Sequence, residues 1–86
     1  MKKEKMEGII EAILFTMGES VELSRMAKTL EQTEEAVKEA ITDMNQKYKK
    51  ENRGIHIIEL NGAYQLCTKP EVYEYLIRIA KQPKKQ

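Results

Sequence analysis

Apolar residues recur at steps of three and four over residues 6–17, which is the spacing of one face of an α-helix. Gly18 follows the last of them and is a natural residue for ending a helix in the left-handed conformation. Ala12 and Phe15 lie beside this stripe and widen the apolar surface. The segment therefore predicts a helix with more apolar surface than one core-facing stripe requires. The stripe consists of Met6, Ile9, Ile10, Ile13, Leu14 and Met17.

Two further amphipathic stretches follow after short polar links. A connector over 19–22 leads into the second helix, and Thr33 is a good N-cap for the third. Glu34 and Glu35 place negative charge in the first turn of that helix, where the helix dipole favours it. The second helix would bury Leu23, Met26, Ala27 and Leu30. The third would bury Val37, Ala40, Ile41, Met44 and Tyr48, and would end at Asn52-Arg53-Gly54.

Asn61-Gly62 is a strong signal for a two-residue β-hairpin turn between strands over 55–60 and 63–68. A two-residue turn fixes the register, so that Leu60 pairs with Ala63 and Ile57 pairs with Leu66. One face of the hairpin is richer in large aliphatic side chains and is predicted to cover the core. This inner face holds Ile55, Ile57, Leu66 and Thr68, with Glu59 and Tyr64 toward the tip. The outer face holds His56, Ile58, Leu60, Ala63, Gln65 and Cys67.

Pro70 is predicted to open a last helix that extends to about Ala80, because proline is favoured at the first helical position. Its inward residues would be Val72, Tyr73, Leu76, Ile77 and Ala80. Residues 81–86 are polar and contain a proline, as at the start of a linker or tail. The predicted fold is mainly α with a small β-hairpin (α+β), a winged helix-turn-helix domain over residues 1–80.

Composition narrows the class of protein. The chain has 86 residues, of which 34% are charged, yet its formal net charge is only +1. That balance argues against a protein that coats nucleic acid by excess positive charge. A single cysteine forms no internal disulfide, and no apolar run approaches the roughly eighteen residues of a membrane span. We expect a cytoplasmic domain without a signal peptide and without a membrane segment.

A winged-helix transcription regulator that reads DNA is the alternative function. In such a protein the third helix presents its first residues to base edges. Here that end carries Glu34, Glu35, Lys38 and Glu39, so carboxylates would meet the phosphates. The wing tip over 59–63 has no Arg or Lys, and the basic cluster over 47–53 lies at the far end of the helix. We therefore expect no sequence-specific DNA binding.

The hairpin register places His56 opposite Cys67, the one pairing that suggests a nucleophile or a metal site. Two ligands are fewer than the three or four of a zinc site, and an open hairpin offers no oxyanion hole. The four glycines are scattered and form no phosphate-binding loop. The sequence predicts no enzyme activity, no metal and no cofactor.

Several motifs in order resemble the N-terminal part of the segregation and condensation protein B (ScpB) family. They are the Glu-Ala-Ile-Leu-Phe run at 11–15, Gly18-Glu19 with Val21, and Gly62, Tyr64 and Leu66 in the wing. The resemblance covers about 6–80. It implies two winged-helix domains in the full-length protein, of which this chain holds the first, and homodimerisation through that first domain.

The resemblance also implies partners and a location. ScpB-like proteins bind the kleisin ScpA, with contacts largely on the second domain, and join the SMC ATPase in a bacterial condensin-like complex that organises and segregates chromosomes. Such a protein is cytoplasmic and associates with the nucleoid through its complex. This fragment would act as the homodimerisation module.

Apolar side chains left outside the core are the candidates for that dimer interface. Ala12 and Phe15 lie off the first helical stripe, and Ile58, Leu60 and Ala63 lie on the outer wing face. Contiguous exposed apolar surface marks interaction sites in small proteins. We therefore predict a symmetric dimer that uses these five residues.

Overall fold

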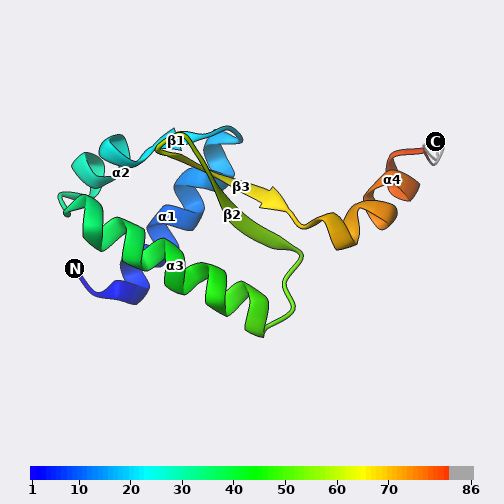
Figure 1. Ribbon diagram of the computed structural model, residues 1–86, viewed down its shortest axis with the longest axis horizontal. Helices are drawn as coiled ribbons and strands as arrows, with labels where there is room; N and C mark the ends of the chain where they lie inside the picture. Colours follow the sequence, from blue (N-terminus) through cyan, green and yellow to red (C-terminus); the bar gives the residue numbers. More distant parts are fainter. Residues whose placement is uncertain (82–86) are drawn as a thin grey trace.

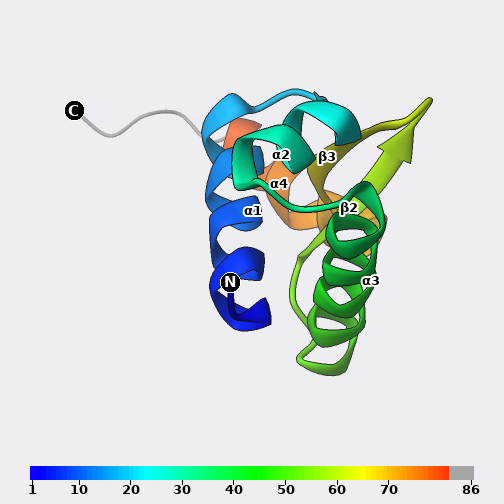
Figure 2. The same ribbon diagram turned by 90° about the vertical axis from the view of Figure 1, so that its left-hand side faces the viewer.

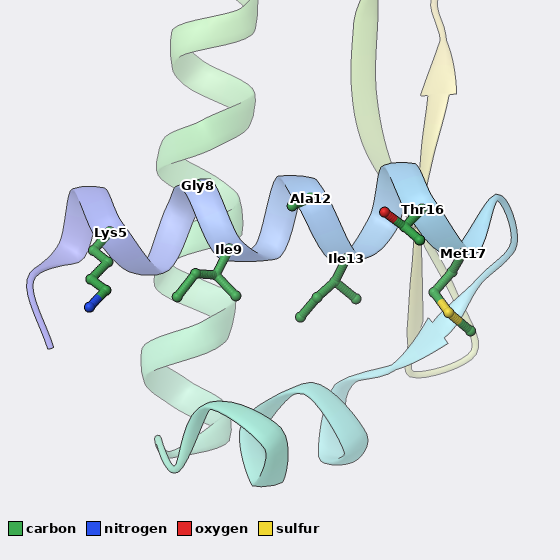
Figure 3. Close-up of a pocket in the computed structure, with 7 residues that line it drawn as sticks. All are labelled: Lys5, Gly8, Ile9, Ala12, Ile13, Thr16 and Met17. Carbon is green, nitrogen blue, oxygen red and sulfur yellow. The ribbon is translucent and has the colours of Figure 1, made fainter.

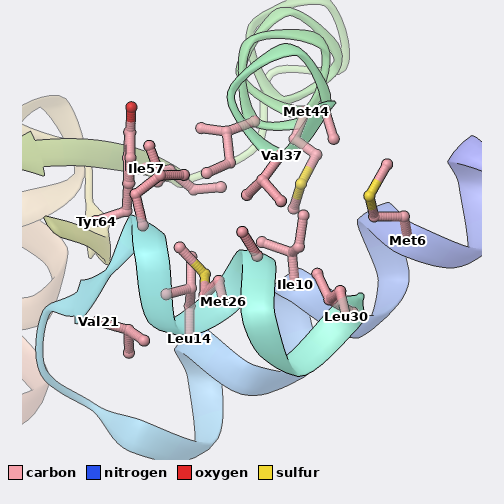
Figure 4. Close-up of a cluster of buried hydrophobic side chains, with 14 of the residues drawn as sticks. Met6, Ile10, Leu14, Val21, Met26, Leu30, Val37, Met44, Ile57 and Tyr64 are labelled. Carbon is pink, nitrogen blue, oxygen red and sulfur yellow. The ribbon is translucent and has the colours of Figure 1, made fainter. Parts of the chain in front are cut away.

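Three helices form the body of the protein in the computed structural model, which describes residues 1–81. They are α1 (Lys3–Met17), α2 (Leu23–Leu30) and α3 (Glu34–Lys50). Figure 2 shows α1 and α3 as two neighbouring columns, with α2 lying across one end of them. Side chains from these helices, together with Val21, Ile57 and Tyr64, form the hydrophobic core (Figure 4).

The predicted buried stripes of α2 and α3 are confirmed in full. On α1 the buried stripe is narrower than predicted. Met6, Ile10 and Leu14 are buried, whereas Ile9 and Ile13 are only partly buried and pack at the edge of the core. Met17, the last member of the predicted stripe, is exposed, as are Ala12 and Phe15.

The predicted helix ends are also present. Gly18 ends α1 with a φ of 66°, and its N–H donates to the Leu14 carbonyl over 3.2 Å. A positive φ of this kind is one that glycine adopts at little cost. The hydroxyl of Thr33 accepts a hydrogen bond from the Ala36 N–H over 3.0 Å, which satisfies one free donor at the start of α3.

The sheet has three antiparallel strands in the order β1-β3-β2. They are β1 (Val21–Glu22), β2 (Ile55–Leu60) and β3 (Ala63–Thr68). The register of β2 and β3 is the predicted one, and Asn61 and Gly62 both have a positive φ, as the turn requires. The strand β1 was not predicted. It pairs with β3 and is followed by a bond from the Leu23 N–H to the Gly62 carbonyl over 3.0 Å.

The inner face of the hairpin is the predicted one, since Ile57 and Tyr64 are buried in the core. On the outer face, Leu60 is 44% exposed and Ile58 is half-buried. Ala63 corrects the prediction, because only 8% of its surface is exposed. It lies on the central strand between Leu60 and Glu22, and these neighbours on both sides screen its single methyl group.

The C-terminal segment differs most from the prediction. Pro70–Val72 form a short 3-10 turn (η1), and the α-helix α4 runs over Tyr73–Lys81. None of the residues of α4 is buried, so the predicted inward face is wrong. Figure 1 shows α4 beyond the end of β3, away from the three-helix body. Of the predicted tail, Lys81 belongs to α4, and residues 82–86 lie outside the described residues.

The order of helices and strands, with two long strands forming a wing, is the predicted winged-helix fold. Within residues 1–81, no helix is long and apolar enough to span a membrane.

The packing of the core predicts how much stability is lost when a cavity is made in it. Ile10 is fully buried, so Ile10→Ala should lower the free energy of unfolding by about 2–5 kcal/mol. Thr42→Ala, at an exposed position of α3, should leave that free energy almost unchanged, because it removes no buried contact. Urea denaturation followed by circular dichroism measures both. Equal losses in the two variants would contradict this account of the core.

Candidate protein-interaction surface

An open apolar groove of about 510 Å³ runs along the outer side of α1 (Figure 3). Gly8, Ala12 and Thr16 recur every four residues, and these small residues form a shallow row along the helix surface, called here the low row. A row of larger side chains stands beside it, with Lys5 at the N-terminal end. We call this feature the α1 groove; it is lined by Lys5, Gly8, Ile9, Ala12, Ile13, Thr16 and Met17.

A second hollow, of about 160 Å³, continues the α1 groove toward α2. The two hollows share Ile13 and Met17. The second also reaches Val21 of β1 and Met26 of α2. The apolar surface therefore extends over more than one element.

The predicted site residues fall into two groups. Ala12 lines the α1 groove, and Phe15 lies three residues further along α1 and is 77% exposed. Helical spacing places Phe15 at the rim of the groove, next to Ala12. Ile58 and Leu60 lie on the wing instead and do not line the groove. Ala63 is screened within the sheet and is removed from the candidate surface.

Polar contacts hold the opposite side of α1 against α3. The Lys47 Nζ lies 2.6 Å from Glu7 Oε1, and Glu7 is only 7% exposed. The Tyr48 hydroxyl donates to the Glu11 carboxylate one turn further along α1. Glu7 and Glu11 project away from the α1 groove, because helical spacing puts them on the other face. These contacts fix which side of α1 stays open.

Several groups within residues 1–81 have shifted pKa values, and three of them lie in the core or at its contact with α1. The hydrogen bond with Glu7 raises the pKa of Lys47. Burial, followed by the hydrogen bond to the Glu11 carboxylate, raises the pKa of the Tyr48 phenol far above its usual value. Burial also raises the pKa of Tyr64. Each shift favours the protonated form that the folded structure contains.

The acidic start of α3 is present as predicted. Glu34, Glu35 and Glu39 are exposed. The Lys3 ammonium lies 3.4 Å from the Glu39 carboxylate and also pairs with Asp43. Two lysines, Lys3 and Lys38, do not balance the four carboxylates, so the exposed start of the helix stays acidic. The surface therefore repels phosphates where a recognition helix would approach them.

His56 and Cys67 face each other across the hairpin, as the register predicts. Both side chains are half-buried. Among the described residues 1–81, no three His, Cys, Asp or Glu residues are close enough together to hold a metal ion.

The sequence analysis did not predict that the apolar face of α4 is exposed. At roughly 100° per residue, its apolar side chains span an arc of roughly 200°. Tyr75 and Ile79, which the predicted core face did not include, account for the extra width and are 59% and 72% exposed. The sequence already contained this signal, because an apolar arc of that width is more than one neighbouring helix or strand can bury. Glu74, Arg78 and Lys81 occupy the remaining side, where Arg78 pairs with Glu74 over 2.6 Å.

Comparison with known proteins decides the family. The sequence model described as "Segregation and condensation complex subunit ScpB" matches residues 8–86. The chain belongs to the ScpB family. The resemblance drawn from the motifs is thereby confirmed.

Curated ScpB relatives are longer than this chain. Segregation and condensation protein B of Agathobacter rectalis is 59% identical over 78 residues, which cover 90% of this chain and 42% of that protein. The protein of the same name from Lachnoclostridium phytofermentans is 46% identical over 85 residues, covering 99% and 45% respectively. The chain thus spans less than half the length of these relatives.

Two solved ScpB structures share the fold. The crystal structure of a dimer of the ScpB N-terminal domain complexed with ScpA peptide matches with a TM-score of 0.82 at 36% identity, covering 88% of this chain and 95% of that one. ScpB from Mycobacterium tuberculosis matches with a TM-score of 0.87 at 16% identity, covering 100% and 56% respectively. In the first structure the N-terminal domain itself is complexed with an ScpA peptide, although the resemblance assigned kleisin contacts largely to the second domain.

The contact between Tyr48 and Glu11 predicts an alkaline titration. Because the folded pKa of Tyr48 lies above the unfolded value of about 10, its contribution to stability is complete below that unfolded value and is lost as the pH rises through the folded pKa. Ultraviolet absorbance of tyrosinate should show late-titrating phenols, and Tyr48→Phe should remove one of them. A titration curve unchanged by Tyr48→Phe would contradict the burial of this hydroxyl beside Glu11.

Proposed function

We propose that this chain is the homodimerising, non-enzymatic module of an SMC–kleisin complex that condenses and segregates bacterial chromosomes in the cytoplasm. One observation carries the proposal: Phe15 is 77% exposed on α1, and helical spacing places it beside the apolar groove. A phenylalanine held in water on a rigid helix costs free energy that burial at a partner would recover. The dimer of the related ScpB N-terminal domain supports a second copy as that partner.

The proposed interface combines Ala12 and Phe15 on α1 with Ile58 and Leu60 on the wing. Burying two large apolar side chains such as Phe15 and Leu60 contributes about 3–5 kcal/mol before the cost of association. A symmetric dimer uses each side chain twice, because the same patch of both copies meets. Because each of the four residues is buried in both copies, eight side chains would form the centre of the interface.

A kleisin segment is the second proposed partner, and SMC joins through the kleisin. The related N-terminal domain is complexed with its ScpA peptide as a dimer. We propose that this chain likewise binds the kleisin as a dimer. The acidic start of α3 supports a protein partner in place of DNA, because Glu34 and Glu35 are exposed there.

Aspartate at the proposed interface tests the dimer. Phe15→Asp and Leu60→Asp each place a charge where the partner would bury apolar surface, so each should weaken dimerisation at least about tenfold. Sedimentation equilibrium measures the dissociation constant, and circular dichroism checks that the fold survives. Thr42→Asp, exposed on α3, is the matched control and should leave the constant unchanged.

Loss of dimer in both interface variants but not in the control is the expected pattern. An unchanged constant in a folded Phe15→Asp variant rejects the α1 surface as the interface. Fluorescence titration of the unaltered protein addresses the alternative function. Micromolar, steeply salt-dependent binding of duplex DNA without binding of an ScpA peptide would favour a DNA-reading regulator.

A further inference from the structure

The apolar face of α4 is exposed. Tyr75, Ile77 and Ile79 are each more than half exposed, and no residue of α4 is buried. With side-chain surfaces on the order of 200 Å² for the largest residues, the face amounts to several hundred Å². Patches of that size mark interaction sites on small proteins. A helix this short is also marginal in water unless its apolar face packs against something.

The residue that precedes η1 and α4 is fixed to the base of the wing. The Lys69 N–H donates to the Gly54 carbonyl over 2.9 Å, at the end of the hairpin far from its turn. From there α4 extends away from the three-helix body (Figure 1). The protein is accordingly elongated, with extents of 47 × 25 × 25 Å. In this arrangement α4 leaves its own α1 groove uncovered.

The α1 groove has the shape and chemistry to receive a helix. Its low row of Gly8, Ala12 and Thr16 allows the backbone of another helix to approach closely. The lining residues follow α1 for about three turns, and the nine residues of α4 make about two and a half turns. One chain therefore carries both an open apolar groove and an unpacked apolar helix that fits its length.

We propose that α4 of one copy lies in the α1 groove of a second copy, and that the second copy returns the same contact. The inference rests on the proposed homodimer and specifies how the two copies meet. The exchange is isologous, so it closes the dimer and leaves no free groove or helix. Two helix faces and the two grooves that receive them would bury on the order of 1,600 Å², the usual size of a specific interface. Phe15, at the rim of the groove, lies where it would flank the incoming helix.

A pair of variants with the same change in net charge tests the contact in the full chain. Ile79→Lys places a charge on the apolar face of α4, and Glu74→Gln makes the same +1 change on its polar face. Ile79→Lys should raise the dimer dissociation constant at least about tenfold. Glu74→Gln should change it less than twofold. Sedimentation equilibrium compares the two, and circular dichroism confirms that both are folded.

Disulfide trapping locates the contact between different chains. A tagged chain with Ala12→Cys is mixed with an untagged chain that has Ala80→Cys, both with Cys67→Ser. Ala12 lines the groove and Ala80 lies on the apolar face of α4. Mild oxidation should give a mixed, tagged–untagged dimer on a denaturing gel. The pair Ala12→Cys and Lys81→Cys, with the second thiol on the polar face, is the matched control and should give little.

The outcomes separate this inference from the proposed function. A dimer whose mass is insensitive to Ile79→Lys, with no mixed disulfide, overturns the helix exchange but leaves the homodimer standing. A protein that stays monomeric at millimolar concentration overturns both. A dimer that is unchanged by Ile79→Lys but loses affinity for an ScpA peptide would assign α4 to the kleisin, and it also overturns the exchange.

Discussion

The packing of α1 against α2 and α3 is the contact on which the rest of the structure depends. Met6, Ile10 and Leu14 bury one narrow stripe of α1, and the Glu7 and Glu11 carboxylates fix the adjoining face to Lys47 and Tyr48. A domain of this size has a small core and cannot cover a helix on all sides. The remaining face of α1, with the α1 groove and Phe15, is therefore held open to solvent in a defined orientation. The same contact that stabilises the fold also presents the candidate surface.

Much of this fold could be predicted from local signals. The buried residues of α2 and α3, the Thr33 cap and the Asn61-Gly62 register all follow from periodicity and turn chemistry. The strand β1 could not be predicted, because two residues show no alternation and their pairing with β3 is a long-range contact. Its omission also explains the error at Ala63, whose neighbours on both strands screen it. The error on α4 has a different origin: an amphipathic pattern shows that a face requires cover, but not which molecule provides the cover.

The candidate surface was predicted in part for the same reason. The width of the apolar stripe on α1 pointed to Ala12 and Phe15; Ala12 lines the α1 groove, and Phe15 is exposed one turn along the helix from it. Sequence spacing could not reveal the groove itself, which results from the low row of Gly8, Ala12 and Thr16 beside larger neighbours. The chain that carries this surface belongs to the ScpB family.

The central claim is that the exposed apolar face of α4 packs against a second copy of the chain. Amide hydrogen exchange of α4, measured over a range of protein concentrations, tests it most directly, because an unpacked helix exchanges rapidly and a packed one does not. The account predicts that protection of residues 73–81 rises as the protein is concentrated and reaches a plateau when dimerisation is complete. Rapid exchange at every concentration, or protection that does not depend on concentration, would contradict it.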